Sequence, residues 1–222
     1  MVTIWLGSGR MLVLASASPR RAMLLEAEGF SFIRVEADVS EVLPQGISPE
    51  SAVKGLALRK AQAGLNRWLN HGGSREDIIL GADTIVVLNQ QILGKPRDEE
   101  EAEAMLTALS GQTHYVYTGV ALVNGAGRQE CGAVCTAVFF RSLTHEEILE
   151  YIATGEPVDK AGAYGIQGLG GHLVDHYEGS LSNVIGLPME YVKERLSVWG
   201  MGLGDIALHE VKDGLPSVKG ST

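Results

Sequence analysis

The most constraining feature of this 222-residue chain is an apolar run that turns directly into a helix start. Residues 11–15 read Met-Leu-Val-Leu-Ala and predict a short buried strand. A tight turn follows, and a helix opens at Pro19 with Ser18 as its N-cap, the hydroxyl accepting from first-turn amides. Gly29 suits the left-handed residue that ends such a helix. The chain is therefore organised around a strand, turn and helix unit.

The charge in the first turn of this helix conflicts with that pattern. A helix N-terminus carries a partial positive charge and favours Asp or Glu, yet this chain has Arg20 and Arg21 there. The conflict costs about 0.3–1 kcal/mol per exposed charge. One interpretation is an anion held by free amides, by the Ser16 and Ser18 hydroxyls and by the two guanidinium groups. The alternative is that both arginines pair with acidic neighbours on the surface.

Composition limits the classes of partner. The formal net charge is −9 and about 45% of residues are hydrophobic, which suits a sizeable core. An acidic chain lacks the basic face that nucleic acids and membrane surfaces need, so we expect neither partner. Any bound anion should be small and held by a focal cluster of cations, together with a divalent cation shared with protein carboxylates.

The two cysteines and the apolar pattern indicate a compartment. Cys131 and Cys135 lie about 13 Å apart on a predicted strand, at about 3.3 Å per residue, which is too far for a disulfide. No signal-peptide pattern is present, and no apolar run approaches the ~20 residues of a membrane span. We expect a reduced, cytoplasmic protein.

A second strong helix start follows a strand predicted over residues 31–39 and an acidic loop. Ser48 is the N-cap, Pro49 takes the first position, and the helix runs to about Asn70. Lys60 lies within the apolar face of this helix. Its ammonium must therefore reach the solvent along its stem, pair with a carboxylate or point into a cleft.

Residues 78–88 form two apolar strand-like runs around one carboxylate, Asp83. An ionised carboxylate beside buried strands is costly unless it is paired, metal-bound or facing a cleft. Gly81 permits a bend that would expose it. The alternative is an aspartate that bonds the amides of its own turn. A hairpin turn at residues 89–90 leads to a return strand and then to Lys95 and Arg97.

The middle of the chain alternates helices and strands. Asp98 caps a helix over residues 99–109, and residues 113–123 and 132–140 predict a long hairpin. Residues 144–147 form a capping box at the start of the next helix. We expect His114 to be a strand residue and His145 a helix-surface residue, and neither to be a ligand.

Residues 160–171 are glycine-rich without matching the dinucleotide fingerprint. Glycines let the backbone approach a flat or polyanionic ligand closely. The amide of Gln167 can donate and accept at once, as reading the edge of a uracil-like base requires. After a turn-rich stretch at residues 179–186, Pro188 starts a last helix that ends near Trp199. The element pattern predicts an α/β (α+β) fold, with a mixed sheet flanked by helices and a central cleft between two lobes.

Four segments together resemble the Maf family of nucleotide pyrophosphatases, over about residues 11–196. They are Leu-Ala-Ser-Ala-Ser-Pro-Arg-Arg at 14–21, Gly-Ala-Asp-Thr at 81–84, Gly-Lys-Pro-Arg at 94–97 and Asp-Lys-Ala-Gly-Ala-Tyr-Gly-Ile-Gln-Gly at 159–168. The resemblance implies a fold similar to that of ITP/XTP pyrophosphatases and a homodimer. It also implies hydrolysis of a nucleoside triphosphate to the monophosphate and pyrophosphate with Mg²⁺ or Mn²⁺.

The resemblance also implies residue roles. The catalytic aspartate falls on Asp83, and the substrate-specificity positions fall on Arg20, Thr84 and Gln167, whose identities are similar to those of the dTTP/UTP branch. The branch that prefers 7-methyl-GTP usually has Glu at the position of Gln167. The phosphate-binding positions match Ser16, Arg21, Lys60 and Lys95. The metal positions match Asp83 and Glu41.

The two lines of inference converge on one enzyme. Four cations would neutralise a leaving pyrophosphate, while Asp83 would orient or deprotonate the water, either as a base or mainly as a metal ligand. We divide the chain into an N-terminal extension (1–10), a nucleotide pyrophosphatase domain (11–199) and a tail (200–222). Two alternatives stay open: a nucleotide-binding regulator of cell division without catalysis, and a purine-directed ITP/XTP-type pyrophosphatase.

Overall fold

A computed structural model describes residues 9–201 of the chain. Its strands form one seven-stranded mixed sheet in the order β2-β1-β3-β5-β6-β7, with β4 added to β3. The strands are β1 (Leu12–Ala15), β2 (Phe32–Val35), β3 (Ile78–Leu88), β4 (Gln91–Leu93), β5 (Thr113–Val123), β6 (Gln129–Phe140) and β7 (Val174–Glu178). Strand β1 pairs in parallel with β2 and β3, and the remaining pairs are antiparallel. The predicted mixed α/β sheet is confirmed.

Helices cover the sheet on both faces. The α-helices of the described residues are α1 (Pro19–Ala27), α2 (Pro49–Asn70), α3 (Glu99–Leu109), α4 (His145–Ala153), α5 (Leu181–Ile185) and α6 (Met189–Val198). Three short 3₁₀ helices lie between α4 and β7, namely η1 (Glu156–Asp159), η2 (Ala161–Ala163) and η3 (Leu169–Leu173).

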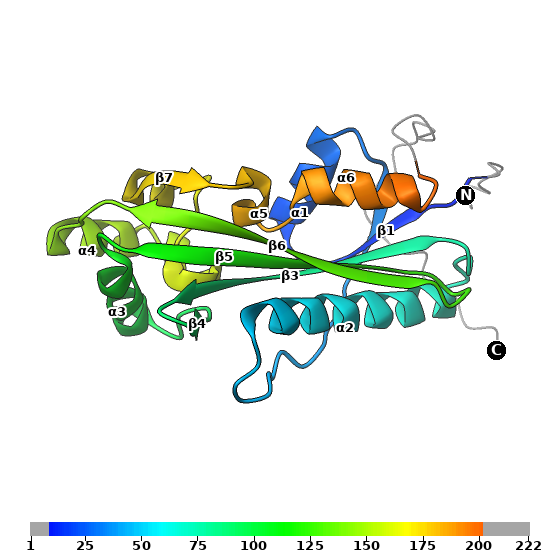
Figure 1. Ribbon diagram of the computed structural model, residues 1–222, viewed down its shortest axis with the longest axis horizontal. Coiled ribbons are helices and arrows are strands. Elements are labelled where there is room, and N and C mark those ends of the chain that lie inside the picture. The colour runs from blue at the N-terminus through cyan, green and yellow to red at the C-terminus, as the bar shows by residue number, and fades with distance from the viewer. Residues whose placement is uncertain (1–8, 202–222) are drawn as a thin grey trace, which may run out of the picture.

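The first lobe contains β1, β2 and one half of the long strands. Figure 1 shows α2 along one face of the sheet, with α1 and α6 on the other. Side chains alternate along β1, so Leu12 and Leu14 join the core beneath α1 and α6, while Val13 and Ala15 pack against α2. This double burial explains why residues 12–15 are apolar without alternation.

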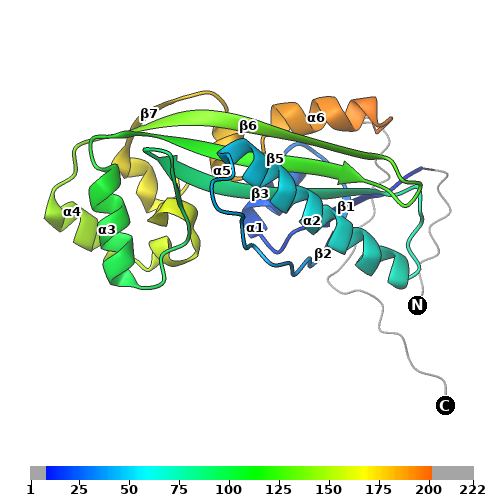
Figure 2. The ribbon, with the colours of Figure 1, turned by 60° about the horizontal axis from the view of Figure 1, so that its bottom comes forward.

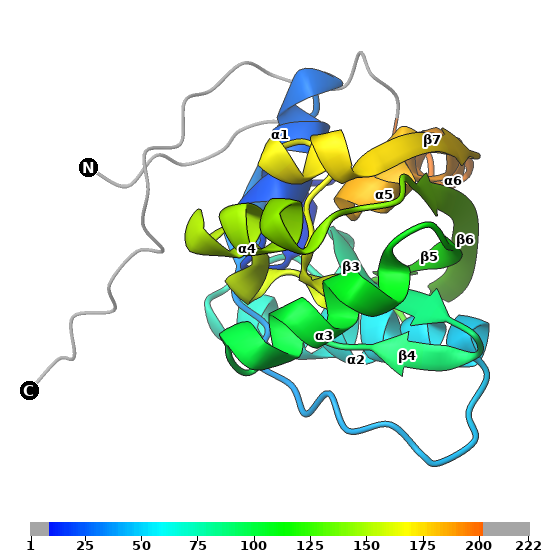
Figure 3. The same cartoon turned by 90° about the vertical axis from the view of Figure 1, so that its left-hand side faces the viewer.

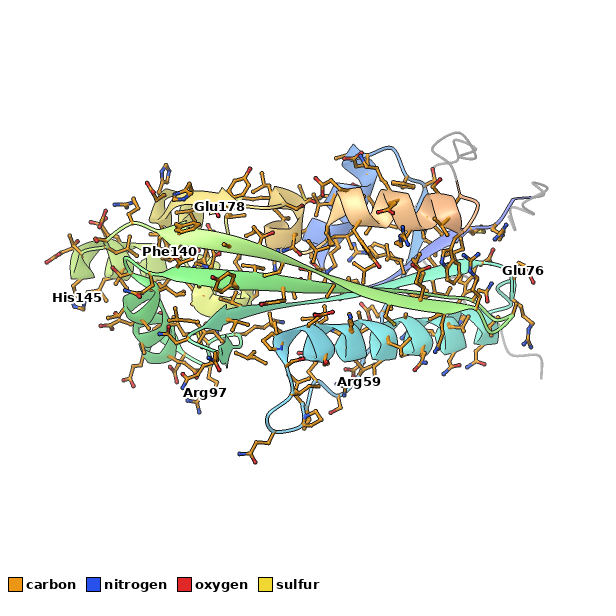
Figure 4. All side chains as sticks on the ribbon, viewed as in Figure 1. Arg59, Glu76, Arg97, Phe140, His145 and Glu178 are labelled. Atoms are coloured by element: carbon orange, nitrogen blue, oxygen red, sulfur yellow. The ribbon has the colours of Figure 1, made fainter. Side chains whose placement is uncertain are left out.

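The second lobe surrounds the other end of β3, β5 and β6. Figure 2 shows α3, α4 and the 3₁₀ segments gathered at that end, away from α2, and in Figure 3 the same end faces the viewer. Their core includes Leu106, Phe140, Ile148 and Tyr164. Figure 4 marks the length of the molecule, with His145 near one end and Glu76 near the other. The two predicted lobes therefore share the three long strands.

Most predicted helix starts are confirmed at the level of single hydrogen bonds. The side chains of Ser48 and Asp98 accept from the amides of Ser51 and Glu101, and Thr144 and Glu147 form the reciprocal capping box. The turn at residues 89–90 has positive φ at both positions, as a tight hairpin requires.

The prediction that the Ser18 side chain caps the first helix was wrong. It occupies the N-cap position of α1, but its side chain makes no capping hydrogen bond. Instead the Oγ of Ser16 accepts from the Ser18 amide at 3.2 Å, because the turn leaving β1 brings the two residues together. The first turn of α1 is therefore left without a side-chain cap.

The expected bend at Gly81 is not observed. Strand β3 is continuous over eleven residues, and Gly81 lies where α2 crosses it. A Cβ atom there would stand 2.4 Å from the carbonyl oxygen of Ala57 and 2.6 Å from the amide nitrogen of Ala61. Gly81 is needed for this close approach of helix and strand.

Other boundaries differ from the sequence analysis. Strand β2 covers residues 32–35 of the predicted 31–39, and the turn-rich stretch at 179–186 contains α5. The sequence analysis did not predict strand β7. The predicted positions of the two histidines are confirmed: His114 lies fully buried in β5, and His145 is exposed at the start of α4.

Cys131 and Cys135 are both free. No helix among residues 9–201 is long and apolar enough to cross a bilayer. The division at residues 10 and 200 stays a prediction, since residues 1–8 and 202–222 lie outside the described part of the chain.

Candidate active site

The candidate site lies at a gap in the edge of β3. Strand β1 pairs with β3 only as far as Gly81, and β4 begins to pair with the same strand at Val86. Residues 82–85 therefore have β5 on one side and, in the described part of the chain, no strand on the other. A cleft of about 790 Å³ opens at this gap, with lining residues from both lobes. Open α/β sheets place ligands where neighbouring connections diverge in this way.

Alternation along β3 sends two polar side chains from the gap in different directions. Asp83 follows Gly81 on the face that meets α2, whereas Thr84 follows Ala82 on the face that meets α1. Both residues line the cleft. Two consecutive residues thus serve opposite walls of one site.

The Asp83 side holds three predicted site residues together. The Lys60 ammonium donates to Asp83 Oδ1 at 2.5 Å and to Glu41 Oε1 at 2.7 Å. The side chains of Lys60 and Asp83 are 13% and 9% exposed, so this contact is shielded from solvent, whereas Glu41 is largely exposed. The Lys60 ammonium therefore pairs inside the cleft, and Asp83 does not bond the amides of a turn.

The Thr84 side holds the buried arginine. The guanidinium of Arg21 donates to the Gly186 carbonyl at 2.8 Å, to Thr84 Oγ1 at 3.1 Å and to Ser16 Oγ at 3.2 Å. All three acceptors are neutral, and no ion pair of Arg21 occurs within residues 9–201. Burial lowers the pKa of Arg21, while the nearby charge of Asp83 opposes that shift. The result is a desolvated cation in the cleft wall.

Arg20 pairs with an acidic neighbour at the surface, as the alternative interpretation predicted for both arginines. Its Nη1 lies 3.3 Å from Asp159 Oδ2, with the two side chains 34% and 65% exposed. Asp159 also accepts from Lys160 at 2.7 Å, and hydrogen bonding to this lysine lowers the pKa of Asp159. The contact joins α1 of the first lobe to η1 of the second. Of the two first-turn arginines, Arg20 alone pairs with an acid found among residues 9–201.

The second lobe contributes the last two predicted residues, Lys95 and Gln167. Both are exposed, and both line the cleft. The Gly162 amide donates to the Gly94 carbonyl at 3.0 Å, which joins the segment that carries Lys95 to the glycine-rich loop that carries Gln167. Every predicted site residue therefore lines one cleft. Arg97 does not, because its guanidinium pairs with Glu101.

Four further charged residues line the cleft without a site role in the sequence analysis, and one of them, Asp38, follows β2. Glu156, Asp159 and Lys160 come from η1 and its end. Asp159 and Lys160 belong to the fourth segment of the family resemblance, which was a usable signal. Glu156 precedes that segment, and only its contacts across the glycine-rich loop bring it to attention.

The carboxylates of the cleft determine what metal the site suits. Within the described ranges, no three His, Cys, Asp or Glu side chains form a ready metal cage. Glu41 and Asp83 nevertheless bond one ammonium, and that hydrogen bond lowers the pKa of Glu41. Mg²⁺ is usually bound through one or two carboxylates together with substrate phosphates. The donor set therefore fits a divalent ion brought to the site with a phosphate ligand.

Several proteins with sequences similar to this chain are named dTTP/UTP pyrophosphatase. A dTTP/UTP pyrophosphatase from Shewanella denitrificans is 50% identical over 185 residues, which cover 80% of this chain and 90% of that protein. A dTTP/UTP pyrophosphatase from Moorella thermoacetica is 47% identical over 191 residues, covering 86% of this chain and 95% of that protein.

Among solved structures, a nucleoside-triphosphatase or dITP/XTP pyrophosphatase from Mycobacterium abscessus matches with a TM-score of 0.37 at 17% identity, covering 60% of this chain and 75% of that chain. The fold class rests on the sheet topology described above. The family model described as Maf-like protein matches residues 11–199, which is most of the described chain. By this match and by the identity to its relatives, the chain belongs to the Maf family.

Proposed function

We propose that this protein hydrolyses dTTP and UTP to the monophosphate and pyrophosphate by cleaving the bond between the α and β phosphates. Relatives between 45% and 50% identical carry the name dTTP/UTP pyrophosphatase. The observation that carries the proposal is the buried Asp83 carboxylate beside Lys60, at a gap in the sheet whose other wall holds the Arg21 cation.

The cations of the cleft would bind the triphosphate. Lys60 lines the cleft from α2, Lys95 from the loop after β4, and Arg20 and Arg21 from α1. Hydrolysis places growing negative charge on the leaving pyrophosphate, so cations held in fixed positions lower the barrier. Ser16, which bonds Arg21 at 3.2 Å, would fix the guanidinium and contribute its own hydroxyl.

Asp83 would orient and deprotonate the attacking water. Among the described residues its carboxylate is held by one contact, from Lys60 to Oδ1, which leaves the second oxygen available to a ligand. Asp83 and Glu41 would hold the divalent ion, Mg²⁺ or Mn²⁺, which when bound neutralises phosphate charge and lowers the pKa of a water. The base would be read by Gln167, with Thr84 and Arg20 completing the specificity positions.

The decisive experiment is pyrophosphate release from dTTP, UTP, CTP, GTP and ITP, each with and without Mg²⁺. We expect metal-dependent release that is greatest for dTTP and UTP. Release mainly from ITP would favour the purine-directed alternative, and tight nucleotide binding without release would favour the regulator. The homodimer stays a prediction, which sedimentation of the full chain would test.

A further inference from the structure

Glu156 makes an unusual set of contacts for a residue at the mouth of the cleft. Its Oε2 accepts from the Leu169 amide at 2.9 Å. Its Oε1 accepts from the Tyr151 hydroxyl at 3.1 Å and from the Gly170 amide at 3.3 Å. A carboxylate that collects several donors forms the stronger, charge-assisted class of hydrogen bond. Glu156 therefore anchors the C-terminal end of the loop over residues 165–170.

The other end of this loop is tied to the same pair of side chains. The Gly165 amide donates to the Tyr151 hydroxyl at 3.1 Å, so Tyr151 bridges Glu156 and the start of the loop. The loop also fits closely over the carboxylate: a Cβ atom on Gly168 would stand 2.4 Å from Glu156 Oε1. Both ends of the loop thus converge on Glu156 and Tyr151.

Gln167 lies between these two tethers. It is exposed at the turn of the loop and lines the cleft, and Glu156 lines the same cleft. Glycines surround Gln167 at positions 165 and 168, and a glycine backbone has more conformational freedom to lose than any other. Without fixed tethers, the amide of Gln167 would sample many orientations and would discriminate poorly between bases.

We propose that Glu156 is a positioning residue for base selectivity: its carboxylate fixes the loop so that Gln167 meets the nucleobase in one orientation. This inference rests on the proposed function, because it takes Gln167 as the residue that reads the base. Glu156 acts through the loop backbone and does not touch the base or the reacting phosphates.

The test compares Glu156→Gln with the unmodified full chain by two readouts. The first is amide hydrogen exchange at Leu169 and Gly170, which we expect to quicken about tenfold, because the carboxamide replaces an acceptor with a donor facing those amides. The second is the dissociation constant of the α,β-imido analogue of UTP against that of CTP. We expect the preference for the uracil analogue to fall about tenfold, with KM raised and kcat within about threefold.

Tyr151→Phe provides an independent variant that keeps the buried ring and removes the bridging hydroxyl. We expect the same shifts at smaller size, and this variant carries the test if Glu156→Gln does not fold. Glu150→Gln is the matched control, because it makes the same substitution at an exposed position of α4, next to Tyr151 in the chain. It should change neither amide exchange nor base preference.

Protected amides at Leu169 and Gly170 in Glu156→Gln would overturn the proposal, and so would an unchanged base preference in the folded variant. An equal fall in kcat on every nucleotide would also overturn it, since that result means direct contact with the reacting groups. Absence of pyrophosphate release by the unmodified protein would instead count against the proposed function, because the analogue and exchange readouts need no turnover.

Discussion

At the scale of single residues, two buried aspartates, one just before β3 and one within it, have different roles. Asp83 is 7% exposed and bonds the Lys60 ammonium, whereas Asp77 is 4% exposed just before the strand. Asp77 accepts from the amides of Met11 and Ser74 and from the Trp68 indole. Burial alone therefore does not distinguish Asp83, which lines the cleft, from Asp77, which stabilises the fold.

Replacing Asp83 by Asn should abolish turnover while keeping the fold. The carboxamide cannot take a proton from water, and general-base removal costs about 10²–10⁴ in rate. The measurement is pyrophosphate release from UTP, with circular dichroism as the check of folding. Asp77→Asn is the matched control: it should lower the free energy of unfolding by about 1–3 kcal/mol and leave kcat of the folded protein unchanged. Near-native turnover by Asp83→Asn would remove this residue from the mechanism.

Replacing Gln167 by Glu should selectively weaken the binding of uracil and thymine nucleotides. A carboxylate cannot donate to a base carbonyl, and an unmet polar group costs about 1–3 kcal/mol, or about 10–100-fold in kcat/KM. Competition between UTP and GTP measures the change. Gln62→Glu adds the same charge on an exposed position of α2 and should leave selectivity intact. Equal selectivity in both variants would contradict the role of Gln167.

At the scale of elements, the position of α2 over β3 determines whether the Lys60 and Asp83 side chains can meet. The helix lies so close to the strand that the backbone of Ala57 and Ala61 fills the space above Gly81. Lys60 is in the same turn of the helix as these two residues. Movement of α2 away from the sheet would therefore separate the ammonium from the carboxylate.

Two glycine substitutions should move stability in opposite directions. Gly81→Ala pushes a methyl group against the α2 backbone and should destabilise the protein by about 1–3 kcal/mol or more, with loss of turnover. Gly55→Ala lies within α2, where an added Cβ meets nothing within 4 Å, and should stabilise by about 0.5–1 kcal/mol. Urea denaturation measures both changes. Equal effects from the two variants would show that close packing at Gly81 is unimportant.

At the scale of the whole molecule, the core of the second lobe contains a titratable group that links global stability to pH. His114 is fully buried in β5, its Nε2 lies 2.8 Å from the Tyr164 hydroxyl, and its Nδ1 has no hydrogen-bond partner within residues 9–201. Burial lowers the pKa of His114 to about 4. The folded protein therefore keeps this imidazole neutral well below the pKa of about 6.5 that it has in an unfolded chain.

The free energy of unfolding should fall as the pH drops from about 6.5 to about 4. In that window the unfolded chain binds a proton that the folded protein does not, so acid favours unfolding, and the loss from this group ends below the folded pKa. About 1.4 kcal/mol per unit over this window gives a loss of roughly 3 kcal/mol. Urea titrations at several pH values measure the slope. His114→Gln should flatten it, whereas the same change at the exposed His172 should not.

The chain's own sequence was enough to determine most helix starts and the long strands. Ser48, Asp98 and Thr144 accept hydrogen bonds from amides three residues further along the chain. Such local contacts can be predicted from a short stretch of sequence. The burial of β1 on both faces is likewise visible as an unbroken apolar run. For the site, the sequence indicated the charge conflict at Arg20 and Arg21 and the lone carboxylate of Asp83.

Only the tertiary structure decided how those residues meet. The gap beside residues 82–85 exists because β1 ends and β4 begins on one edge of β3, and the contacts at this gap join residues far apart in the chain. Arg20 donates to Asp159, which lies 139 residues further along the chain, and Arg21 donates to the Gly186 carbonyl, 165 residues further along. Local propensity cannot encode such pairs, because packing of the two lobes on shared strands decides which distant side chains become neighbours.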